Sequence, residues 1–165
     1  MNLITGGEVL VDCLRKQGVR HVFSIIGGQM GTIYDTIGRR DDIDLFTPRC
    51  ETVTPLMAAG YAATTGKPVA SLTTVGAGVV YEVAGLAYAW LNYLPVISLA
   101  PQVQSWKTKP HQESLQACNQ DEIYYPLTKW NTIVYHWRRI PKMLTRGFRE
   151  AYTGIPGPVH IDIPV

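Results

Sequence analysis

The sequence predicts an α/β fold, a three-layer sandwich in which a six-stranded parallel sheet is covered by helices on both faces. Short runs rich in β-branched residues alternate along the chain with segments of helical length. The short runs are apolar at nearly every position, as expected for strands buried on both faces. With 165 residues the chain can form one core, so we expect a single domain over residues 1–165.

The first elements are expected to alternate between helix and strand. Gly6–Gly18 predicts a helix, because its apolar residues recur at helical spacing and a glycine follows them. His21–Ile26 is an apolar run that ends in two glycines, which indicates a buried strand. We expect a helix over Met30–Ile37, closed by Gly38, and a strand over Ile43–Pro48.

The middle of the chain continues this alternation. Val53–Thr65 predicts a helix that ends at a glycine, and the β-branched run Val69–Thr74 predicts a strand that leads into a glycine-rich loop. Val79–Asn92 predicts a long apolar helix, and Pro95–Ala100 predicts another buried strand. Residues 102–122 are polar and predict no regular element.

The last part of the chain predicts a strand, a helix and a strand. Thr132–Trp137 is rich in β-branched and aromatic residues, which favours a strand. Pro141–Tyr152 has the spacing of a helix, with proline near its start. Val159–Ile163 is a final apolar run, so six runs in all are expected to form the sheet.

Composition and charge exclude several classes of function. The formal net charge is +2 and the basic residues are scattered, which disfavours nucleic-acid binding. No membrane span is expected, because residues 69–101, the nearest candidate, are interrupted by Gly76, Glu82 and Pro95. The cysteines and histidines lack metal-ligand spacing, so we predict no metal site. Three widely spaced cysteines fit no disulfide framework, which favours a reducing, cytoplasmic setting.

Ligand-binding loops in parallel sheets lie at the carboxyl ends of the strands. This rule selects the turn Gly27-Gly28-Gln29, the stretch Pro48–Glu51, the loop Thr74–Gly78 and the polar stretch from Gln102 onward. The first turn reads GGxxG rather than GxGxxG, so it fits a nucleotide-binding turn and an ordinary tight turn alike. The loop Thr74–Gly78 lacks the Lys-Ser/Thr ending of a phosphate-binding P-loop.

Two residues near these loops are candidates for chemistry. Glu51 precedes a helix that is poor in charge. A carboxylate there could stabilise the helix dipole, by about 0.3–1 kcal/mol, or it could exchange protons with a ligand. The local sequence does not decide between these two roles of Glu51. His111 lies in a polar stretch beside Gln112, and it is the histidine that we consider as a site residue.

Four segments of the chain together resemble a known family. In order, they are Arg49-Cys50-Glu51 followed by MAAGYAATTGKP, then TTVGAGVVYEVAGLAYAWLNYLPVISLAPQ, PLTKWN and GIPGPVHIDIP. They are similar to the N-terminal pyrimidine-binding domain of thiamine-diphosphate-dependent enzymes, in the branch of acetolactate synthases and benzaldehyde lyase-like carboligases. The resemblance covers nearly the whole chain and implies the same six-stranded α/β fold.

The resemblance implies a catalytic role for Glu51. In the family, a glutamate at this position hydrogen-bonds N1′ of the cofactor's aminopyrimidine and promotes the imino tautomer, which removes the proton from thiazolium C2. The resulting carbanion attacks the carbonyl of a 2-oxo acid or aldehyde. We therefore expect a 2-oxo acid decarboxylase or carboligase in which Glu51 activates the cofactor.

Further positions match the family's pocket. Gln116 matches a glutamine that points to the reaction centre, and we expect it to act in catalysis together with His111. Besides Glu51, the expected cofactor contacts are Gly27, Gly28, Gln29, Thr74, Gly76, Gly78 and Tyr81. The expected substrate pocket consists of Gln29, His111, Gln112 and Gln116.

Several positions depart from the family pattern. Cys50 replaces the usual histidine before the glutamate, and Ala77 replaces the proline between two glycines. Tyr81 replaces a common asparagine, and Ile26 replaces the proline before the Gly-Gly turn. These differences indicate a divergent pocket, so no particular substrate is assigned.

The chain contains no Gly-Asp-Gly, the motif with which family members bind the diphosphate through Mg²⁺ on a second domain. The resemblance therefore implies that this chain supplies only the aminopyrimidine half of a shared thiamine diphosphate site. We expect a separate diphosphate-binding subunit that holds the Mg²⁺, in an α2β2 assembly.

Three alternatives to a split enzyme remain open. The chain could be the N-terminal domain of a longer enzyme of the same family. It could be a non-catalytic interaction domain derived from that family, although retention of Glu51 speaks against this. It could also be an unrelated dinucleotide-binding domain, which the missing GxGxxG disfavours.

Overall fold

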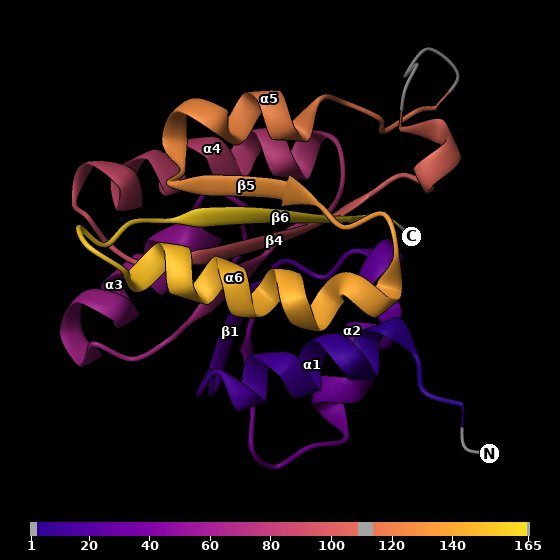
Figure 1. The fold of residues 1–165 in the computed structure, drawn as a ribbon, viewed down its shortest axis with the longest axis horizontal. Helices are drawn as coiled ribbons and strands as arrows, with labels where there is room; N and C mark the ends of the chain where they lie inside the picture. Colours follow the sequence, from indigo (N-terminus) through magenta and orange to yellow (C-terminus); the bar gives the residue numbers. More distant parts are fainter. Residues whose placement is uncertain (1–2, 109–113, 165) are drawn as a thin grey trace.

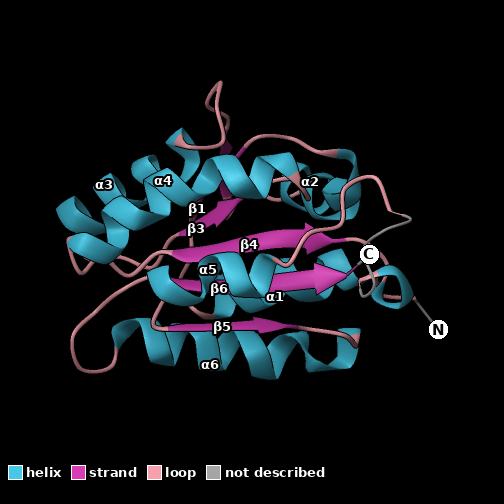
Figure 2. Cartoon of the chain, turned by 90° about the horizontal axis from the view of Figure 1, so that it is seen from above, coloured by secondary structure: helices cyan, strands magenta, loops and turns pink. Residues whose placement is uncertain are grey.

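The computed structural model describes residues 3–108 and 114–164 and contains a sheet of six strands, all parallel. The strand order is β2-β1-β3-β4-β6-β5. In Figure 2 the arrowheads of β4, β5 and β6 point the same way. The strands are β1 (His21–Ser24), β2 (Asp44–Phe46), β3 (Ala70–Leu72), β4 (Ile97–Gln102), β5 (Trp130–Ile133) and β6 (Val159–Pro164). The predicted sheet is confirmed.

Helices cover both faces of the sheet, as predicted. In Figure 1, α4 and α5 lie above β4, β5 and β6, whereas α1 and α6 lie below them. The helices are α1 (Gly6–Lys16), α2 (Gly31–Gly38), α3 (Val53–Thr65), α4 (Ala77–Leu91), α5 (Gln120–Tyr124) and α6 (Ile140–Tyr152). Short 3₁₀ turns are formed by Gly28–Met30, Ser105–Lys107, Tyr125–Leu127 and Trp137–Arg139. No helix in this described part is long and apolar enough to cross a membrane.

Each face of the sheet has its own hydrophobic core. One core joins α1, α2 and α6 to sheet residues such as Leu72 and Leu99, which are fully buried. The other core joins α3, α4 and α5 to residues such as Phe23 and Ala100. Successive strand residues point to opposite faces, so each central strand contributes to both cores. This explains why the strands read as continuous apolar runs.

Local signals define where several helices begin and end. The Thr5 Oγ accepts a hydrogen bond from the Glu8 N–H at 3.1 Å, and the Thr5 N–H donates to the Glu8 carboxylate at 2.7 Å. This capping box satisfies amide groups at the start of α1. At the end of α3, Gly66 adopts φ +66°, the left-handed conformation that glycine tolerates best.

The predicted strand Thr132–Trp137 is wrong at both ends. Strand β5 begins at Trp130, which pairs with Val159 of β6, and it ends at Ile133. Beyond it the chain turns into the 3₁₀ segment Trp137–Arg139, where His136 Nδ1 accepts a hydrogen bond from the Arg138 N–H at 3.2 Å. The local bond stabilises a turn where β propensity favoured a strand. Helix α5, which begins at Gln120 near the end of the polar stretch 102–122, was not predicted.

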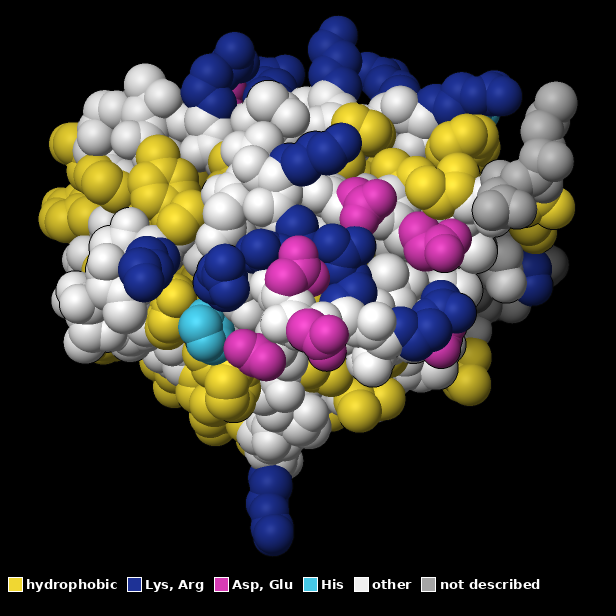
Figure 3. Space-filling view, turned by 90° about the horizontal axis from the view of Figure 1, so that it is seen from below, with side chains coloured by type: hydrophobic (Ala, Val, Ile, Leu, Met, Phe, Trp, Pro, Cys, Tyr) yellow, Lys and Arg dark blue, Asp and Glu magenta, His cyan; other side chains and the backbone are white. Residues whose placement is uncertain are grey.

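Charged side chains of both signs gather on the face formed by α1 and α2, which Figure 3 shows from below. Arg15 and Arg40 both contact Asp42 at 2.8 Å, and Arg40 also contacts Asp12 at 2.6 Å. The hydrogen bonds from Arg40 and Arg15 hold the pKa of the Asp42 carboxyl well below its usual range. Asp42 is therefore the centre of an exposed ion-pair network between α1 and the segment that leads into β2.

We expect Asp42→Asn to make folding less sensitive to acid. Because the pKa of Asp42 is lowered on folding, its contribution is present above the unfolded pKa, about 3.9, and is lost as the pH falls through the folded value. The difference in unfolding free energy between wild type and variant should shrink between about pH 5 and pH 2. Urea unfolding at several pH values measures this. Asp41→Asn, at an exposed neighbour, is the control, and a difference independent of pH would contradict the prediction.

Candidate functional site

The loops singled out by the sequence meet at one edge of the sheet. Strand β1 has β2 on one side and β3 on the other, so the sheet is extended in opposite directions from the point between β1 and β3. Ligands in open parallel sheets bind outside the carboxyl ends of the strands at such a switch point. The turn Gly27-Gly28-Gln29 follows β1 and the loop Thr74–Gly78 follows β3, so both lie at this position.

Hydrogen bonds between side chains join three of the predicted residues. The Thr74 hydroxyl donates to the Gln29 side-chain oxygen at 3.1 Å, and the Gln29 amide donates to the Gln116 side-chain oxygen at 2.8 Å. Gln29 and Gln116 are separated by 87 positions in the sequence. The structure therefore brings loops from three parts of the chain into one polar cluster.

Close packing around Thr74 requires glycine at two positions. A Cβ added at Gly27 would lie 2.5 Å from Thr74 Oγ1, and one added at Gly78 would lie 2.5 Å from Thr74 Cγ2. Gly76 has φ +75°, and a Cβ there would lie 3.0 Å from the Gln116 carbonyl oxygen. Side chains at these positions would push apart the loops that hold Thr74 and Gln116.

The turn after β1 is held from the adjacent helix α2. The Tyr34 hydroxyl donates to the Ile25 carbonyl at 3.1 Å and accepts from the Gly27 N–H at 3.4 Å. The Ser24 hydroxyl lies 3.0 Å from the phenolic oxygen of Tyr34. Burial raises the pKa of the Tyr34 phenol, which stays neutral and keeps both its donor and acceptor roles. Gln29 is therefore carried on a fixed turn.

Glu51 lies in the turn before α3, beside the glycine-rich loop. Its side chain is half-buried, and a Cβ added at Gly78 would lie 3.5 Å from Glu51 Cγ. Its backbone carbonyl accepts hydrogen bonds from the Thr54 N–H at 3.1 Å and the Thr54 hydroxyl at 2.7 Å. Within residues 3–108 and 114–164, no side chain or backbone group hydrogen-bonds its carboxylate. The backbone of Glu51 is thus held while its carboxylate is available to a ligand.

Other predicted residues are not part of this cluster. Tyr81 is 61% exposed on α4, and its backbone carbonyl accepts from the Thr52 hydroxyl at 2.6 Å. A Cβ at Gly28 would meet nothing within 4 Å. Cys50 is exposed. His111 and Gln112 lie outside the residues that the structure describes. Across the described ranges, no group of three or more His, Cys, Asp or Glu could hold a metal ion.

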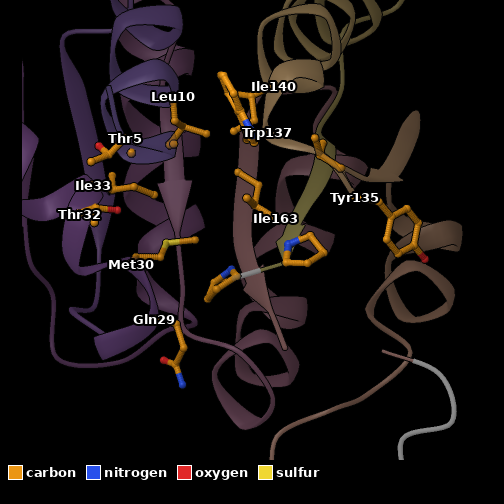
Figure 4. Close-up of a pocket in the computed structure, with 15 residues that line it drawn as sticks. Thr5, Leu10, Gln29, Met30, Thr32, Ile33, Tyr135, Trp137, Ile140 and Ile163 are labelled. Carbon is orange, nitrogen blue, oxygen red and sulfur yellow. The ribbon is translucent and has the colours of Figure 1, made fainter. Parts of the chain in front are cut away.

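A pocket that Gln29 also lines lies next to this cluster. It has a volume of about 330 Å³ and lies between the α1–α2 side and the start of α6. In Figure 4, Gln29 lies at one end of the pocket, Ile33 and Ile163 lie near its middle, and Leu10 and Ile140 lie toward the other end. Its lining includes Gln29 and none of the other predicted site residues. The cluster around Thr74 and Glu51 is therefore a separate feature.

The sequence reading missed a buried polar group next to this cluster. Glu82, on α4, is 0% exposed and hydrogen-bonds to Ser71, Thr73, Ser98 and Tyr124. His160 and Asp162 of β6 are also 0% exposed. A carboxylate in an otherwise apolar helix was the available signal, but it was read only as an interruption of a possible membrane span.

Comparisons with known proteins identify the family of this chain. Residues 4–123 match the family described as thiamine pyrophosphate enzyme, N-terminal TPP binding domain, and the chain belongs to this family. It is 35% identical over 160 residues to the mitochondrial acetolactate synthase catalytic subunit of Aspergillus candidus, covering 97% of this chain and 23% of the relative.

Bacterial relatives give the same result. The chain is 35% identical to the acetolactate synthase large subunit of Haemophilus influenzae, covering 99% of the chain and 28% of the relative. It is 34% identical to the isozyme 1 large subunit of Escherichia coli, covering 97% and 28%. The chain therefore spans about a quarter of the length of these curated relatives.

Proposed function

We propose that this chain forms the aminopyrimidine half of a thiamine diphosphate site in an acetolactate synthase-like enzyme that decarboxylates a 2-oxo acid and carries out carboligation. The observation that carries the proposal is the Glu51 carboxylate, which has no partner within the described ranges and lies beside the glycine-rich loop. Membership of the family supports the cofactor, and similarity to acetolactate synthases supports the reaction class.

The residues present fit an aminopyrimidine ring. A carboxyl group that faces N1′ can hold or give up a proton at that atom, which is the role proposed for Glu51. The glycines at 27, 76 and 78 let Thr74 and Gln116 pack closely against the loops beside Glu51, which holds these loops in place around the proposed ring. When bound, thiamine diphosphate would supply the carbanion that attacks a carbonyl carbon. Glu51 would promote this chemistry by holding or giving up the proton at N1′.

The polar cluster beside Glu51 is proposed to contact the substrate. Gln29 and Gln116 hold each other through their amides. Among the contacts of the described residues, the second amide hydrogen of Gln29 and the amide nitrogen of Gln116 are unused and are proposed to bind carboxylate or carbonyl oxygens. His111 and Gln112 precede Gln116 in the chain and are proposed to line the same pocket. Thr74 fixes Gln29 by donating to its oxygen.

The diphosphate and its Mg²⁺ are proposed to be bound by a separate subunit, in an α2β2 assembly. Because these 165 residues contain no Gly-Asp-Gly, the diphosphate half of the site is proposed to lie outside them. The alternative is that this sequence is one domain of a longer enzyme, and the coverage of only 23–28% of the relatives' length favours it. Both arrangements assign the same role to Glu51.

The split-enzyme proposal is tested by mixing. The chain would be assayed alone and with a candidate diphosphate-binding chain, by calorimetry with thiamine diphosphate and Mg²⁺ and by decarboxylation of 2-oxo acids. We expect weak cofactor binding and no turnover from either chain alone, and both tight binding and turnover from the mixture. Turnover by this chain alone would contradict the proposal, and so would a mixture in which the cofactor binds tightly but no 2-oxo acid reacts.

A further inference from the structure

A network of buried polar groups lies between the sheet and helices α4 and α5. The Glu82 carboxyl is its centre, with contacts to the hydroxyls of Ser71 at 2.6 Å, Thr73 at 3.2 Å, Ser98 at 3.0 Å and Tyr124 at 2.9 Å. None of the ion pairs found within the described ranges involves Glu82. A buried carboxylate that is paired only with neutral hydroxyls is costly, because its charge has no counterion.

The strand register creates this network. Ser71 pairs with Ser98 across β3 and β4, and Ser98 pairs with His160 across β4 and β6. The three side chains therefore form a row on one face of the sheet, and α4 places Glu82 against this row. Figure 2 shows α5 lying over β4 and β6, and from α5 the Tyr124 ring stacks on His160 with 3.7 Å between ring centroids.

Two further titratable groups continue the row. Ser98 Oγ lies 2.8 Å from His160 Nδ1, and His160 Nε2 lies 3.0 Å from Asp162 Oδ1. Gln120 also donates to Asp162 Oδ1. With both carboxyls ionised and the imidazole neutral, this fully buried cluster would hold two negative charges. Two protons shared among Glu82, His160 and Asp162 make the cluster neutral, which removes most of that cost.

Counting hydrogens indicates where those protons lie. Thr54 donates its one hydroxyl hydrogen to the Glu51 carbonyl at 2.7 Å, so the 3.1 Å contact between Ser71 and Thr54 must use the hydrogen of Ser71. The contact between Ser71 and Glu82 then needs a hydrogen from Glu82. If Glu82 were ionised, one of these three contacts would join two oxygens with no hydrogen between them.

The same count applies on the other side of Glu82. If the Ser98 hydroxyl donates to Glu82, the contact of Ser98 with His160 Nδ1 requires a hydrogen on that nitrogen, and Nε2 donates to Asp162. His160 is then a cation beside an ionised Asp162. A protonated Glu82 then makes the cluster neutral. The Tyr124 hydroxyl has one hydrogen for two acceptors, the Val79 carbonyl at 2.7 Å and Glu82 at 2.9 Å, and donates it to one of them.

We propose that Glu82 is a buried, protonated carboxylic acid that positions Glu51 through Ser71 and Thr54. The chain of donors runs from Glu82 to Ser71, from Ser71 to Thr54 and from Thr54 to the Glu51 carbonyl. Glu82 acts on the turn that carries Glu51 and touches no ligand itself. The protonation state of Glu82 does not depend on the proposed function. The effect of Glu82 on proton exchange at Glu51 does rest on the proposed function.

Infrared difference spectroscopy of the complete enzyme tests the protonation state. Subtracting the spectrum of Glu82→Gln from that of wild type should leave the carbonyl stretch of a protonated carboxyl group, shifted to lower frequency in D₂O. Glu122→Gln, at an exposed glutamate, should instead remove the bands of an ionised carboxylate. Carboxylate bands in the Glu82→Gln difference would overturn the proposal.

Stability and proton exchange test the positioning role. Glutamine can donate to Ser71 as a protonated acid does, so Glu82→Gln should keep the wild-type melting temperature, whereas Glu82→Leu should lower it. In the complex with the diphosphate-binding chain, exchange of the cofactor C2 proton should stay at the wild-type rate in Glu82→Gln. We expect it to fall at least tenfold in Glu82→Leu, since a displacement of about 1 Å can cost ~100-fold in rate.

A second pair of variants keeps the test decisive if Glu82→Leu fails to fold. Thr54→Val removes the hydroxyl that reaches Glu51 and leaves Glu82 intact, and Thr54→Ser restores that hydroxyl. Slow exchange of the C2 proton in Thr54→Val, with the wild-type rate restored in Thr54→Ser, supports the chain of donors from Glu82 to Glu51. If Thr54→Val and Thr54→Ser exchange the C2 proton at the same rate, the proposal is overturned. If Glu51→Gln leaves exchange unchanged, the proposed function fails, while the infrared result for Glu82 still stands.

Discussion

Replacing Glu51 by glutamine should slow exchange of the cofactor C2 proton by at least about 100-fold in the complex with the diphosphate-binding chain, since positioned acid–base groups contribute ~10²–10⁴ in rate. The amide has the size of the carboxyl group but cannot take up or release a proton at N1′. The measurement is deuterium exchange into thiamine diphosphate, quenched with acid and followed by NMR.

The interpretation of Glu51→Gln depends on intact folding and binding. Because the carboxylate makes no hydrogen bond within the described ranges, the substitution should leave the melting temperature unchanged. Glu122→Gln is the matched control, and its exchange rate should equal that of wild type. If Glu51→Gln exchanges the C2 proton as fast as wild type while binding the cofactor normally, the role proposed for Glu51 is wrong.

Replacing Gly85 by alanine should lower the free energy of unfolding by about 1–3 kcal/mol, the usual cost of overpacking a core. Gly85 lies where α4 crosses α3, and an added Cβ would collide with the Thr52 carbonyl oxygen and lie 2.6 Å from Pro55 Cγ. The obstacle is backbone, which cannot rotate away as a side chain could. Urea unfolding followed by circular dichroism measures the loss.

Gly60→Ala provides the matched control for Gly85→Ala. Gly60 is exposed in α3, and an added Cβ would meet nothing within 4 Å. Alanine is favoured over glycine in a helix by about 0.5–1 kcal/mol, so this variant should be more stable than wild type. We therefore expect the free energy of unfolding to fall in Gly85→Ala and to rise in Gly60→Ala. A stabilised Gly85→Ala would show that α3 and α4 can separate at no cost.

The crossing at Gly85 also affects the candidate site. Thr52, which the added methyl group would displace, is the neighbour of Glu51 and donates its hydroxyl to the Tyr81 carbonyl at 2.6 Å. A variant that folds with a shifted α4 should therefore also lose C2 proton exchange. Close helix packing and the placement of Glu51 depend on the same backbone segment.

Elements with strong local signals were predicted well from the sequence. Val53–Thr65 was predicted with the bounds that the structure shows, because helical periodicity continues up to Gly66, which closes the helix. The buried central strands β3 and β4 are apolar runs bounded by glycine, proline or polar residues, and these too were found. In such segments, local propensity and burial favour the same structure.

Elements set by tertiary contacts were predicted poorly. Helix α5 is five residues long, too short for a periodic pattern, and Tyr124 is buried because its hydroxyl reaches Val79 and Glu82 on α4. Strand β5 starts at Trp130 because Val159 of β6 lies opposite. The partner in each case is distant in the sequence, so local patterns carry no signal for it.

The candidate site divides in the same way. The rule that functional loops follow parallel strands selects Gln29, Glu51 and Thr74 from the sequence alone, because strand direction places those loops on one edge. It did not indicate that Gln29 and Gln116 would hydrogen-bond, or that Gly78 would pack against Thr74. Such contacts depend on the order of strands in space and on side-chain geometry.

The order of residues along the chain was enough to specify an α/β fold, a parallel sheet and the family, since periodicity, glycine stops and motif spacing are local properties. The buried network of Glu82, His160 and Asp162 depended on the tertiary structure. Its members come from α4 and β6, and only the pairing of β4 with β6 and the packing of α4 on the sheet bring them together. Burial then changes an isolated polar residue in an apolar helix into a group whose charge must be neutralised.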